Sequence, residues 1–406
     1  MAREYRLMSS DGHLEVPPER WVHRVPEKYR DRAPRSIHLP DGGDALLIEG
    51  QPLLEANFLD LRAGRPAGQW QPFGLKVEDA AGTGSPEQRV QEQDRDGMDA
   101  EVLFPAMVAG PAFWRNISHD EVYKAVIRAY NDWLGEEYCA VDRDRLIGMG
   151  VMPISNVDDA IAEMEHCARL GLKGILLGAL PNGKAYPTPE DHKFWAAAVD
   201  MGMPVTVHVA FNRTGARASQ PTFKYPREDP AIMGRIRRPF LEWLTNFGLP
   251  PSISIAQLIL AGVFDRFPTL KVFFAETRLG WVPFWLEHAD LWYERHRGWA
   301  EEYLGMQPLK ALPSEYVKEH IYFSVQYEHV AVELRHHVGI DRIMFATDFP
   351  HIECEWPNSR PLVDKIYADI PAEEKDKIWA GNAVHFFRLE QAPREQKAAG
   401  KAAVSA

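Results

Sequence analysis

The amino-acid sequence predicts an α/β fold, a (β/α)8 TIM barrel with inserted lid or interface segments. Eight short apolar runs recur along the chain, and most are nearly continuous, as expected for strands buried on both faces of a parallel sheet. Amphipathic segments separate these runs, and several runs end in Asp, Glu or His. A doubly wound open sheet is the alternative, but no glycine-rich phosphate loop follows the first run.

The expected strands extend over most of the chain. They comprise residues 4–13, 100–107, 146–153, 172–179, 203–210, 270–276, 320–326 and 342–350. A helix is expected over 118–141, where Ser118 and Glu121 have capping-box spacing, and another over 157–171, ending at Gly171. Residues 190–202 and 328–339 repeat the helical pattern. Strand followed by helix, repeated in this way, favours the barrel.

Two segments exceed the minimal repeat, at about 14–95 and 211–256. Both begin at the carboxyl end of an expected strand, where barrel active sites lie. We interpret them as lid elements or interface arms within a single domain that spans residues 1–390. The tail, residues 391–406, lacks an apolar face, so we expect it to be disordered.

Composition excludes several classes of partner. The formal net charge of -12 argues against a nucleic-acid surface, which needs basic patches. The sequence has no apolar signal segment behind its first residues and no run of membrane-span length, so we expect no membrane partner. The three cysteines, Cys139, Cys167 and Cys354, have neither disulfide nor zinc-finger spacing, which is typical of the reducing cytoplasm.

The chain contains twelve tryptophans. Their simplest role is packing in the core and between subunits, and we therefore expect a homodimer or a higher homo-oligomer. A binding site for a bulky apolar small molecule is the alternative.

Five ionisable residues stand at the ends of expected strands. They are Asp11, His13, His208, Glu276 and Asp348. Alternate residues of a strand face the same side, so Asp11 and His13 point together into the barrel mouth. Singly, each residue has a structural explanation: a core histidine, a helix cap at Asp348, or an ion pair between Glu276 and Arg278. Together they indicate a site for Zn²⁺, Mn²⁺ or Fe²⁺, because buried carboxylates need compensating charge.

Several stretches carry a family resemblance. They are "DGHLEVP", "AGVFDRFPTLKVFFAETRLGWVPFWLEHAD", "FATDFPHIECEWPNS" and "GNAVHFFRL". Over roughly residues 5–390 the chain resembles the amidohydrolase superfamily, specifically the branch of aminocarboxymuconate-semialdehyde decarboxylase and the resorcylate decarboxylases. The resemblance implies that Asp11, His13, His208 and Asp348 bind metal. It also implies that His351 lies near the substrate.

Two positions depart from the family pattern. The first-strand motif is usually His-x-His or Glu-x-His, and here it is Asp11-Gly12-His13. The sixth strand usually ends in histidine, and here it ends in Glu276. A carboxylate at this position either binds or bridges a second metal or acts as a base. The additional acids favour Fe²⁺ or Mn²⁺, or two ions.

The expected function is that of a metal-dependent hydrolase. The metal lowers the pKa of a bound water, and Asp348 accepts its proton as hydroxide attacks a carbonyl or thiocarbonyl carbon. The metal and His351 stabilise the oxyanion, while Glu276 is a further ligand or proton carrier. The expected substrate is an amide, ester, thioester or lactone of an organic acid with an apolar part.

Two alternative functions remain open. The first is a metal-dependent, non-oxidative decarboxylase of an aromatic or unsaturated carboxylic acid. The second is a metal-free binding protein on a barrel scaffold, in which the same residues are ordinary hydrogen-bonded groups.

A few further residues are weaker candidates. Arg278 either holds a substrate carboxylate or pairs with Glu276. Glu15 either faces the site or caps the turn after the first strand, and we favour the turn. Glu353 and Glu355 are expected to be solvated loop residues. His336 and His337 are expected on the surface of a helix.

Overall fold

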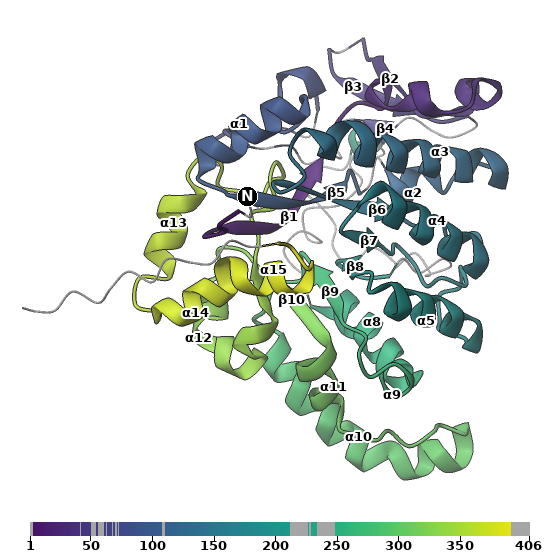
Figure 1. The fold of residues 1–406 in the computed structure, drawn as a ribbon, viewed down its shortest axis with the longest axis vertical. Helices are drawn as coiled ribbons and strands as arrows, with labels where there is room; N and C mark the ends of the chain where they lie inside the picture. Colours follow the sequence, from purple (N-terminus) through teal and green to yellow (C-terminus); the bar gives the residue numbers. More distant parts are fainter. Residues whose placement is uncertain are drawn as a thin grey trace, which may run out of the picture.

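The computed structural model describes residues 3–390 except 41, 50–53, 56–60, 62, 67, 70, 72, 108–109, 212–225, 227–228 and 234–247. Eight parallel strands form one sheet around which the helices are arranged (Figure 1). In their order around the sheet they are β1 (Met8–Leu14), β5 (Ala100–Pro105), β6 (Leu146–Val151), β7 (Gly174–Leu176), β8 (Val205–His208), β9 (Val272–Ala275), β10 (Ile321–Val325) and β11 (Ile343–Phe345). All eight lie on the runs predicted from sequence, and most are shorter.

The sheet closes between its first and last strands. Gly12 of β1 bridges Phe349, which follows β11, in parallel orientation. The amide of His13 donates to the Phe349 carbonyl at 2.7 Å, and the amide of Asp348 donates to the Asp11 carbonyl at 2.9 Å. The predicted (β/α)8 barrel is therefore confirmed, and its closure aligns the ends of β1 and β11.

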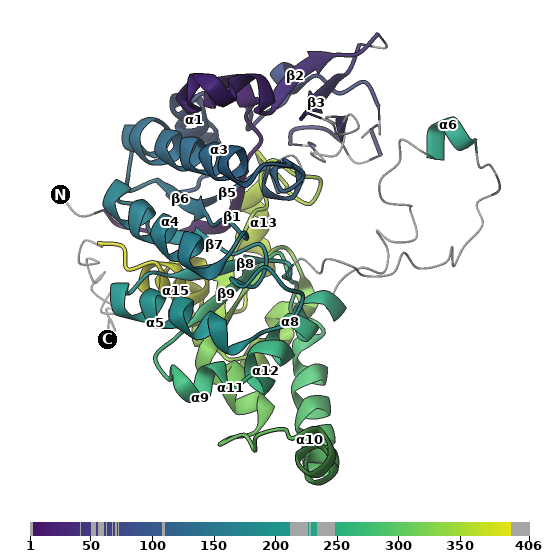
Figure 2. The same cartoon turned by 90° about the vertical axis from the view of Figure 1, so that its right-hand side faces the viewer.

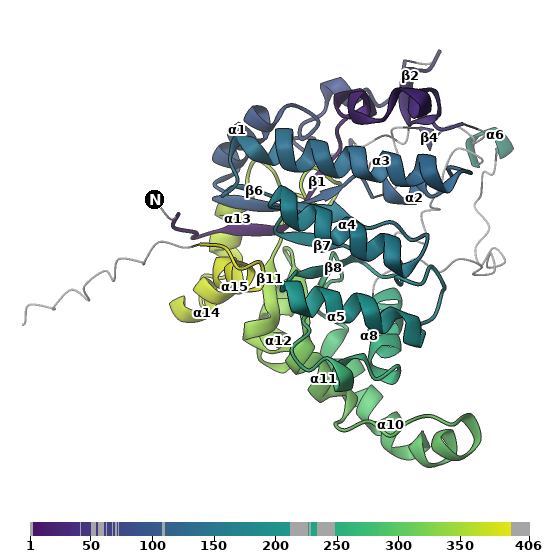
Figure 3. The same ribbon diagram turned by 45° about the vertical axis from the view of Figure 1, so that its right-hand side comes forward.

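Helices cover the outside of this sheet (Figure 3). They are α1 (Pro86–Asp96), α2 (Pro111–Trp114), α3 (Asp120–Trp133), α4 (Val157–Leu170), α5 (His192–Met201), α6 (Pro230–Met233), α8 (Leu249–Leu260), α9 (Val263–Arg266), α10 (Val282–Leu304), α11 (Pro313–His320), α12 (His329–Val338), α13 (Ser359–Ile366), α14 (Ala372–Asp376) and α15 (Asn382–Phe386). As predicted, α4 ends at Gly171, whose φ of 79° lies in the left-handed region that glycine adopts readily.

The predicted capping box at the start of α3 is wrong. The N-cap residue is His119, and no side chain caps this helix end. Glu121 instead accepts a hydrogen bond of 2.6 Å from the Tyr29 hydroxyl. Ser118 and Glu121 have the spacing of a capping box, but the Glu121 carboxylate binds Tyr29, in the segment after β1, instead of the helix end.

The first insertion contains a small antiparallel sheet. Its strands are β2 (Arg35–His38), β3 (Asp44–Leu47) and β4 (Leu54–Glu55), and they stand apart from the barrel strands in Figure 2. Ser36, Asp44 and Leu46 line a small cavity together with Leu14 and Glu15, so this sheet packs against the chain that leaves β1. Most of the second predicted insertion, and the tail predicted to be disordered, lie outside the described residues.

The barrel interior is apolar at the level of mid-strand. Alternate strand residues such as Met8, Phe104, Met149, Phe273 and Met344 pack there as one buried cluster. A cluster of charged side chains begins beyond this level, at the carboxyl ends of the strands. Among the described residues, no helix combines the length and apolar character that crossing a membrane requires.

Candidate metal centre at the barrel mouth

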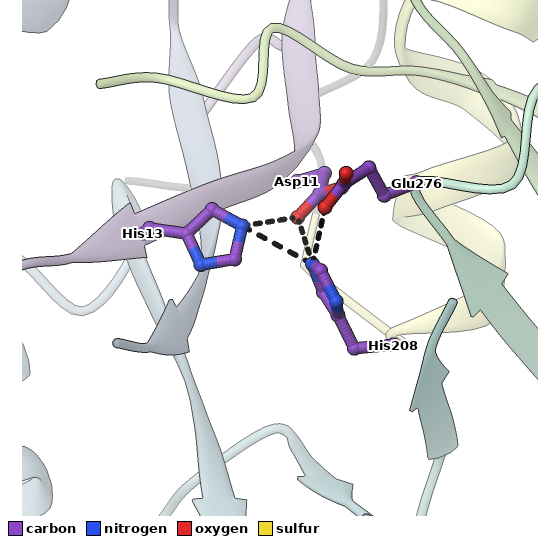
Figure 4. A group of neighbouring side chains, drawn as sticks. All are labelled: Asp11, His13, His208 and Glu276. Carbon is purple, nitrogen blue, oxygen red and sulfur yellow. Dashed lines mark hydrogen bonds and ion pairs between the residues drawn. The ribbon is translucent and has the colours of Figure 1, made fainter. Parts of the chain in front are cut away.

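Asp11 and His13 come from β1, and both side chains are fully buried. The pairing of β1 with β5 shifts register between Ser9 and Gly12, so the regular ladder is interrupted next to Asp11. The two side chains point to the same side, as the alternation rule predicts (Figure 4). The Nε2 atom of His13 lies 3.4 Å from Oδ1 of Asp11, and its Nδ1 atom lies 3.2 Å from the carbonyl of Pro105.

His208 is the last residue of β8 and faces the same space. Its Nε2 atom lies 3.1 Å from Nε2 of His13, 3.6 Å from Oδ1 of Asp11 and 3.3 Å from Oε2 of Glu276. Two imidazole nitrogens this close must share a proton or a cation. The next residue, Val209, has φ 56°, and the Ala210 amide donates to the His208 carbonyl at 2.7 Å. This tight turn is strained for a β-branched residue.

Glu276 and Asp348 complete the cluster from β9 and β11. Both have positive φ angles, 51° and 56°, in a region unfavourable for residues other than glycine. The Glu276 amide donates to Oγ of Ser324 on β10 at 2.7 Å, which stabilises this conformation. Oδ1 of Asp348 lies 3.2 Å from Nε2 of His13. Strained backbone at three strand ends around one cluster is typical of a functional site.

The cluster has the composition and spacing of a metal site. Potential ligand atoms of Asp11, His13, His208 and Glu276 all lie within 4.8 Å of one another, and so do those of His13, Glu276, Asp348 and His351. All four carboxylate oxygens of Asp11 and Asp348 are buried without a well-oriented hydrogen-bond donor among the described residues. Imidazole nitrogens of the cluster face the two Oδ1 atoms at 3.1 to 3.6 Å. Buried carboxylate oxygens without donors are costly, and a divalent cation satisfies them. The five predicted ligands are thus brought together, with His13 and Glu276 common to both groups.

The charges in the cluster shift its pKa values strongly. Burial and the neighbouring Asp348 carboxylate raise the pKa of Glu276 to about 8. Burial alone would raise the pKa of Asp348, but His351 and His13 lower it. Burial and His351 oppose protonation of His13, yet the facing carboxylates of Asp11 and Asp348 raise its pKa to about 9. Without a cation, protons on the imidazoles offset the carboxylates, and a bound metal would replace those protons.

His351 lies against this cluster on its outer side. Its ring stacks on that of His13 with centroids 3.9 Å apart, and its Nδ1 atom lies 3.1 Å from Oδ1 of Asp348. Its Nε2 atom lies 2.8 Å from Oε1 of Glu15. The prediction that Glu15 caps a turn is therefore wrong, because this carboxylate is buried and faces the site. The alternation of Asp11, His13 and Glu15 was the available signal for it.

Arg278 also follows β9 with a positive φ, 60°. It forms an ion pair with Glu353, instead of the considered pair with Glu276. Glu353 was predicted to be solvated, and this is wrong, since only 14% of its side chain is exposed. Arg278 attracts the Glu353 carboxylate to the rim of the mouth. Glu355, His336 and His337 are exposed, as predicted.

A buried arginine supports the site from behind. Arg89 of α1 donates from Nε to Glu101 of β5 at 2.7 Å and from Nη1 to the His13 carbonyl at 2.9 Å. Its Nη2 atom donates to the Phe349 carbonyl at 3.3 Å. One guanidinium thus ties the backbones next to His13 and Asp348 together. Sequence reasoning missed this residue, because nothing in a helical segment marks an arginine that points inward.

The tryptophans near the mouth belong to the core. Trp21 and Trp114 are buried and line a cavity of about 30 Å³ beside Glu15. That volume is about the share of one water molecule in the liquid. This cavity therefore does not support the alternative of a pocket for a bulky apolar ligand.

Comparison with known proteins places the chain in a family. A family model described as Amidohydrolase matches residues 11–389. The 2-amino-3-carboxymuconate-6-semialdehyde decarboxylase of Dictyostelium discoideum is 26% identical over 311 residues, which cover 75% of this chain and 77% of that protein. A gamma-resorcylate decarboxylase of Rhizobium sp. is 23% identical over 372 residues, which cover 85% of this chain and 100% of that protein.

Solved structures share the fold. An amidohydrolase from Mycobacterium avium subsp. paratuberculosis superposes with a TM-score of 0.70 at 18% identity, covering 95% of this chain and 100% of that one. A 5-carboxyvanillate decarboxylase from Novosphingobium aromaticivorans, complexed with manganese, gives a TM-score of 0.66 at 19% identity, covering 95% and 96%.

These findings correct one prediction and confirm another. The expected hydrolase is wrong, because both similar sequences are decarboxylases. The error has a physical origin: carboxylates and imidazoles that hold a metal serve either reaction, so the ligands alone do not distinguish them. The predicted resemblance is confirmed, and with residues 11–389 matched, the chain belongs to the amidohydrolase family of enzymes.

Proposed function

We propose that the protein is a metal-dependent, non-oxidative decarboxylase of an aromatic or unsaturated carboxylic acid. The observation that carries this proposal is the similarity to decarboxylases over most of the chain, in a barrel whose mouth holds a buried His and carboxylate cluster. Asp11, His13, His208 and Asp348 are the proposed metal ligands. Glu276 is a further ligand or the proton donor, and His351 and Arg278 contact the substrate.

Asp11, His13, His208 and Asp348 would hold the metal, which would supply Lewis-acid chemistry to the substrate carboxylate. The bond between the carboxylate carbon and the substrate carbon breaks, and its electron pair stays on the substrate. A proton from a side chain then bonds to that carbon, and CO₂ leaves. Arg278 and His351 hold the negative substrate at the rim of the cluster.

Glu276 is the best candidate for the proton donor. Without a metal, burial and Asp348 raise its pKa to about 8, and a bound cation would lower this pKa from that value. Asp348, whose pKa is lowered, is ionised there. A donor with a pKa near the working pH combines the correct protonation state with a favourable transfer.

Among the three predicted metals, Mn²⁺ has additional support, because the 5-carboxyvanillate decarboxylase of similar fold is complexed with manganese. The proposed site holds one or two ions. The two overlapping ligand groups, which share His13 and Glu276, support either count.

The proposal is tested by measuring CO₂ release. The protein is loaded separately with Mn²⁺, Zn²⁺ and Fe²⁺ and supplied with 2,6-dihydroxybenzoate, 5-carboxyvanillate and other unsaturated acids. We expect stoichiometric CO₂ and the decarboxylated product from at least one acid, and no CO₂ after chelation of the metal. Absence of CO₂ from every acid with every metal would contradict the proposal.

A homodimer or higher homo-oligomer also stays a prediction. Exposed aromatic residues along α10 support it, since large aromatic side chains at a surface are enriched in protein interfaces. A cytoplasmic location likewise stays a prediction.

A further inference from the structure

Gln326 has the features of a substrate-binding residue that neither the motifs nor the metal cluster identify. It follows β10 directly, between Glu276 at the end of β9 and Asp348 beyond β11 in the order of the sheet. Its side chain is only 2% exposed. Neither Nε2 nor Oε1 has a hydrogen-bond partner among the described residues.

The strand geometry directs this amide toward the mouth of the barrel. Tyr322 of β10 belongs to the buried cluster inside the barrel, and Ser324, two residues on, binds the Glu276 amide. Gln326 is the next residue on that side of the strand. The Ala346 amide donates to the Val325 carbonyl at 2.8 Å, so Gln326 lies beside β11 just before Asp348.

A buried primary amide without partners is unusual. It offers two N–H donors and a carbonyl acceptor, and leaving them unpaired destabilises the folded protein. The buried oxygens of Asp11, Asp348 and Glu15 at the same end of the barrel also lack some or all of their partners. Groups of this kind clustered around one mouth indicate that a ligand completes them.

We propose that Gln326 is a specificity-determining residue of the decarboxylase, and that its amide binds a second hydroxyl group of the substrate, in addition to the one beside the carboxylate that leaves. A hydroxyl group both donates and accepts, so it pairs with Oε1 and Nε2 together. A carboxylate only accepts and leaves Oε1 unpaired, and an alkyl group leaves both atoms unpaired. This inference rests on the proposed function, since it names a substituent of that reaction's substrate.

The test compares substrates that differ by one hydroxyl group. Metal-loaded wild type and Gln326→Met are supplied with 2-hydroxybenzoate and with 2,3-, 2,4-, 2,5- and 2,6-dihydroxybenzoate. For wild type, we expect kcat/KM to be about ten- to a hundredfold higher for at least one dihydroxy acid than for 2-hydroxybenzoate. In Gln326→Met, kcat/KM for that dihydroxy acid should fall about ten- to a hundredfold, so that its preference over 2-hydroxybenzoate disappears.

Thermal stability provides a second readout. If Gln326 had a purely structural role, its replacement would lower the melting temperature. Replacing an unpaired buried amide by a thioether of similar shape should leave the melting temperature unchanged or raise it. The matched control is Asn131→Leu, because the buried Asn131 amide donates to the Val151 carbonyl and to Glu163 and accepts from the Val151 amide. This variant should lose stability and keep the wild-type preference among the acids.

The results also separate this inference from the proposed function. Dissociation constants of the same five acids are measured by calorimetry on the metal-loaded protein, so binding is read even where no CO₂ forms. Three results would each overturn the role of Gln326. They are an equal loss of affinity for all acids in Gln326→Met, no loss of affinity for any acid, and no binding of any acid to wild type. Hydroxyl-dependent binding without CO₂ release would support Gln326 and overturn decarboxylation instead.

Discussion

The barrel mouth buries ionisable residues, whereas helix α10 exposes large aromatic residues, and both are departures from the usual division between core and surface. At the mouth, Asp11, His13, Glu276 and Asp348 are ionisable and largely or fully buried. Along α10, which extends beyond the barrel in Figures 1 and 3, Trp292 and Trp299 are 45% and 47% exposed. A buried charge and an exposed tryptophan are each unfavourable alone, so each region suggests something that the chain alone does not provide.

The two regions differ in how completely their polar groups find hydrogen-bond partners within the chain. On α10, the rings of Trp292 and His296 stack at 4.7 Å, and Nε1 of Trp299 donates to Nδ1 of His296 at 2.7 Å. These contacts satisfy the Trp299 N–H group from within the helix. At the mouth, the buried carboxylate oxygens of Asp11 and Asp348 have no well-oriented hydrogen-bond donor among the described residues, and only imidazole nitrogens face them. Unsatisfied buried charge therefore specifies its ligand far more narrowly than an exposed aromatic surface does.

The largest effect is expected from Asp348→Asn. The change removes a ligand charge from the cluster while keeping the shape of the side chain, so CO₂ release should fall at least about a hundredfold with the fold intact. Rates are compared with those of Glu355→Gln, an exposed acid in the same loop, which should match wild type. Retention of more than about a tenth of the wild-type rate by Asp348→Asn would show that the mouth does not depend on this carboxylate.

His208→Ala should reduce metal content together with activity. The Nε2 atom of His208 lies within 3.6 Å of His13, Asp11 and Glu276, so its loss opens one side of the centre. Metal per chain is measured by mass spectrometry after gel filtration, with the exposed His336→Ala as control. A full wild-type metal complement in His208→Ala would make His208 a substrate or core residue.

The pH dependence of stability should reveal the carboxylate repulsion at the mouth. Glu276 has a pKa of about 8 in the folded protein against an ordinary value of 4.5, so folding favours its protonated form. The associated stability is present below about pH 4.5 and is lost as the pH rises toward 8. In chelator, the melting temperature of wild type should therefore fall over this range more steeply than that of Glu276→Gln.

Bound metal should weaken this dependence, because a cation favours the ionised carboxylate. Glu276→Gln also separates the two roles of Glu276. A ligand role predicts less metal per chain, and a proton-donor role predicts unchanged metal with a lower rate. If the melting temperatures of wild type and Glu276→Gln changed by the same amount between pH 5 and pH 8, Glu276 would not be the source of the effect.

The sequence predicted the parts of the site that follow local periodicity. Asp11 and His13 were found because strands alternate, and His208, Glu276 and Asp348 because they end apolar runs. Glu353 and Arg89 were missed, since their roles depend on partners 75 and 260 residues away along the chain. Gln326 was missed for another reason: what distinguishes it is the absence of a partner in the folded protein.

The smallest effect on chemistry is expected from changes on α10. Trp292→Glu and Trp299→Glu should leave CO₂ release per chain at the wild-type level, because both rings lie on a helix that leads away from the mouth. Stability of the isolated subunit should change by no more than about 0.5 kcal/mol, as is usual for exposed positions. The measurable change should be in subunit association.

If the protein forms a homo-oligomer, we expect α10 to contact a second copy of this chain. A twofold axis midway between Trp292 and Trp299 would let each copy cover the other's exposed rings, because such an interface presents the same surface twice. Light scattering across micromolar concentrations should then give a dimer or larger species for wild type and a lower mass for the double variant. Tyr186→Glu, an exposed aromatic residue outside α10, is the control and should keep the wild-type mass. A monomeric wild type at every concentration would contradict the prediction, and the aromatic rings of α10 would then be stabilised by their own stacking alone.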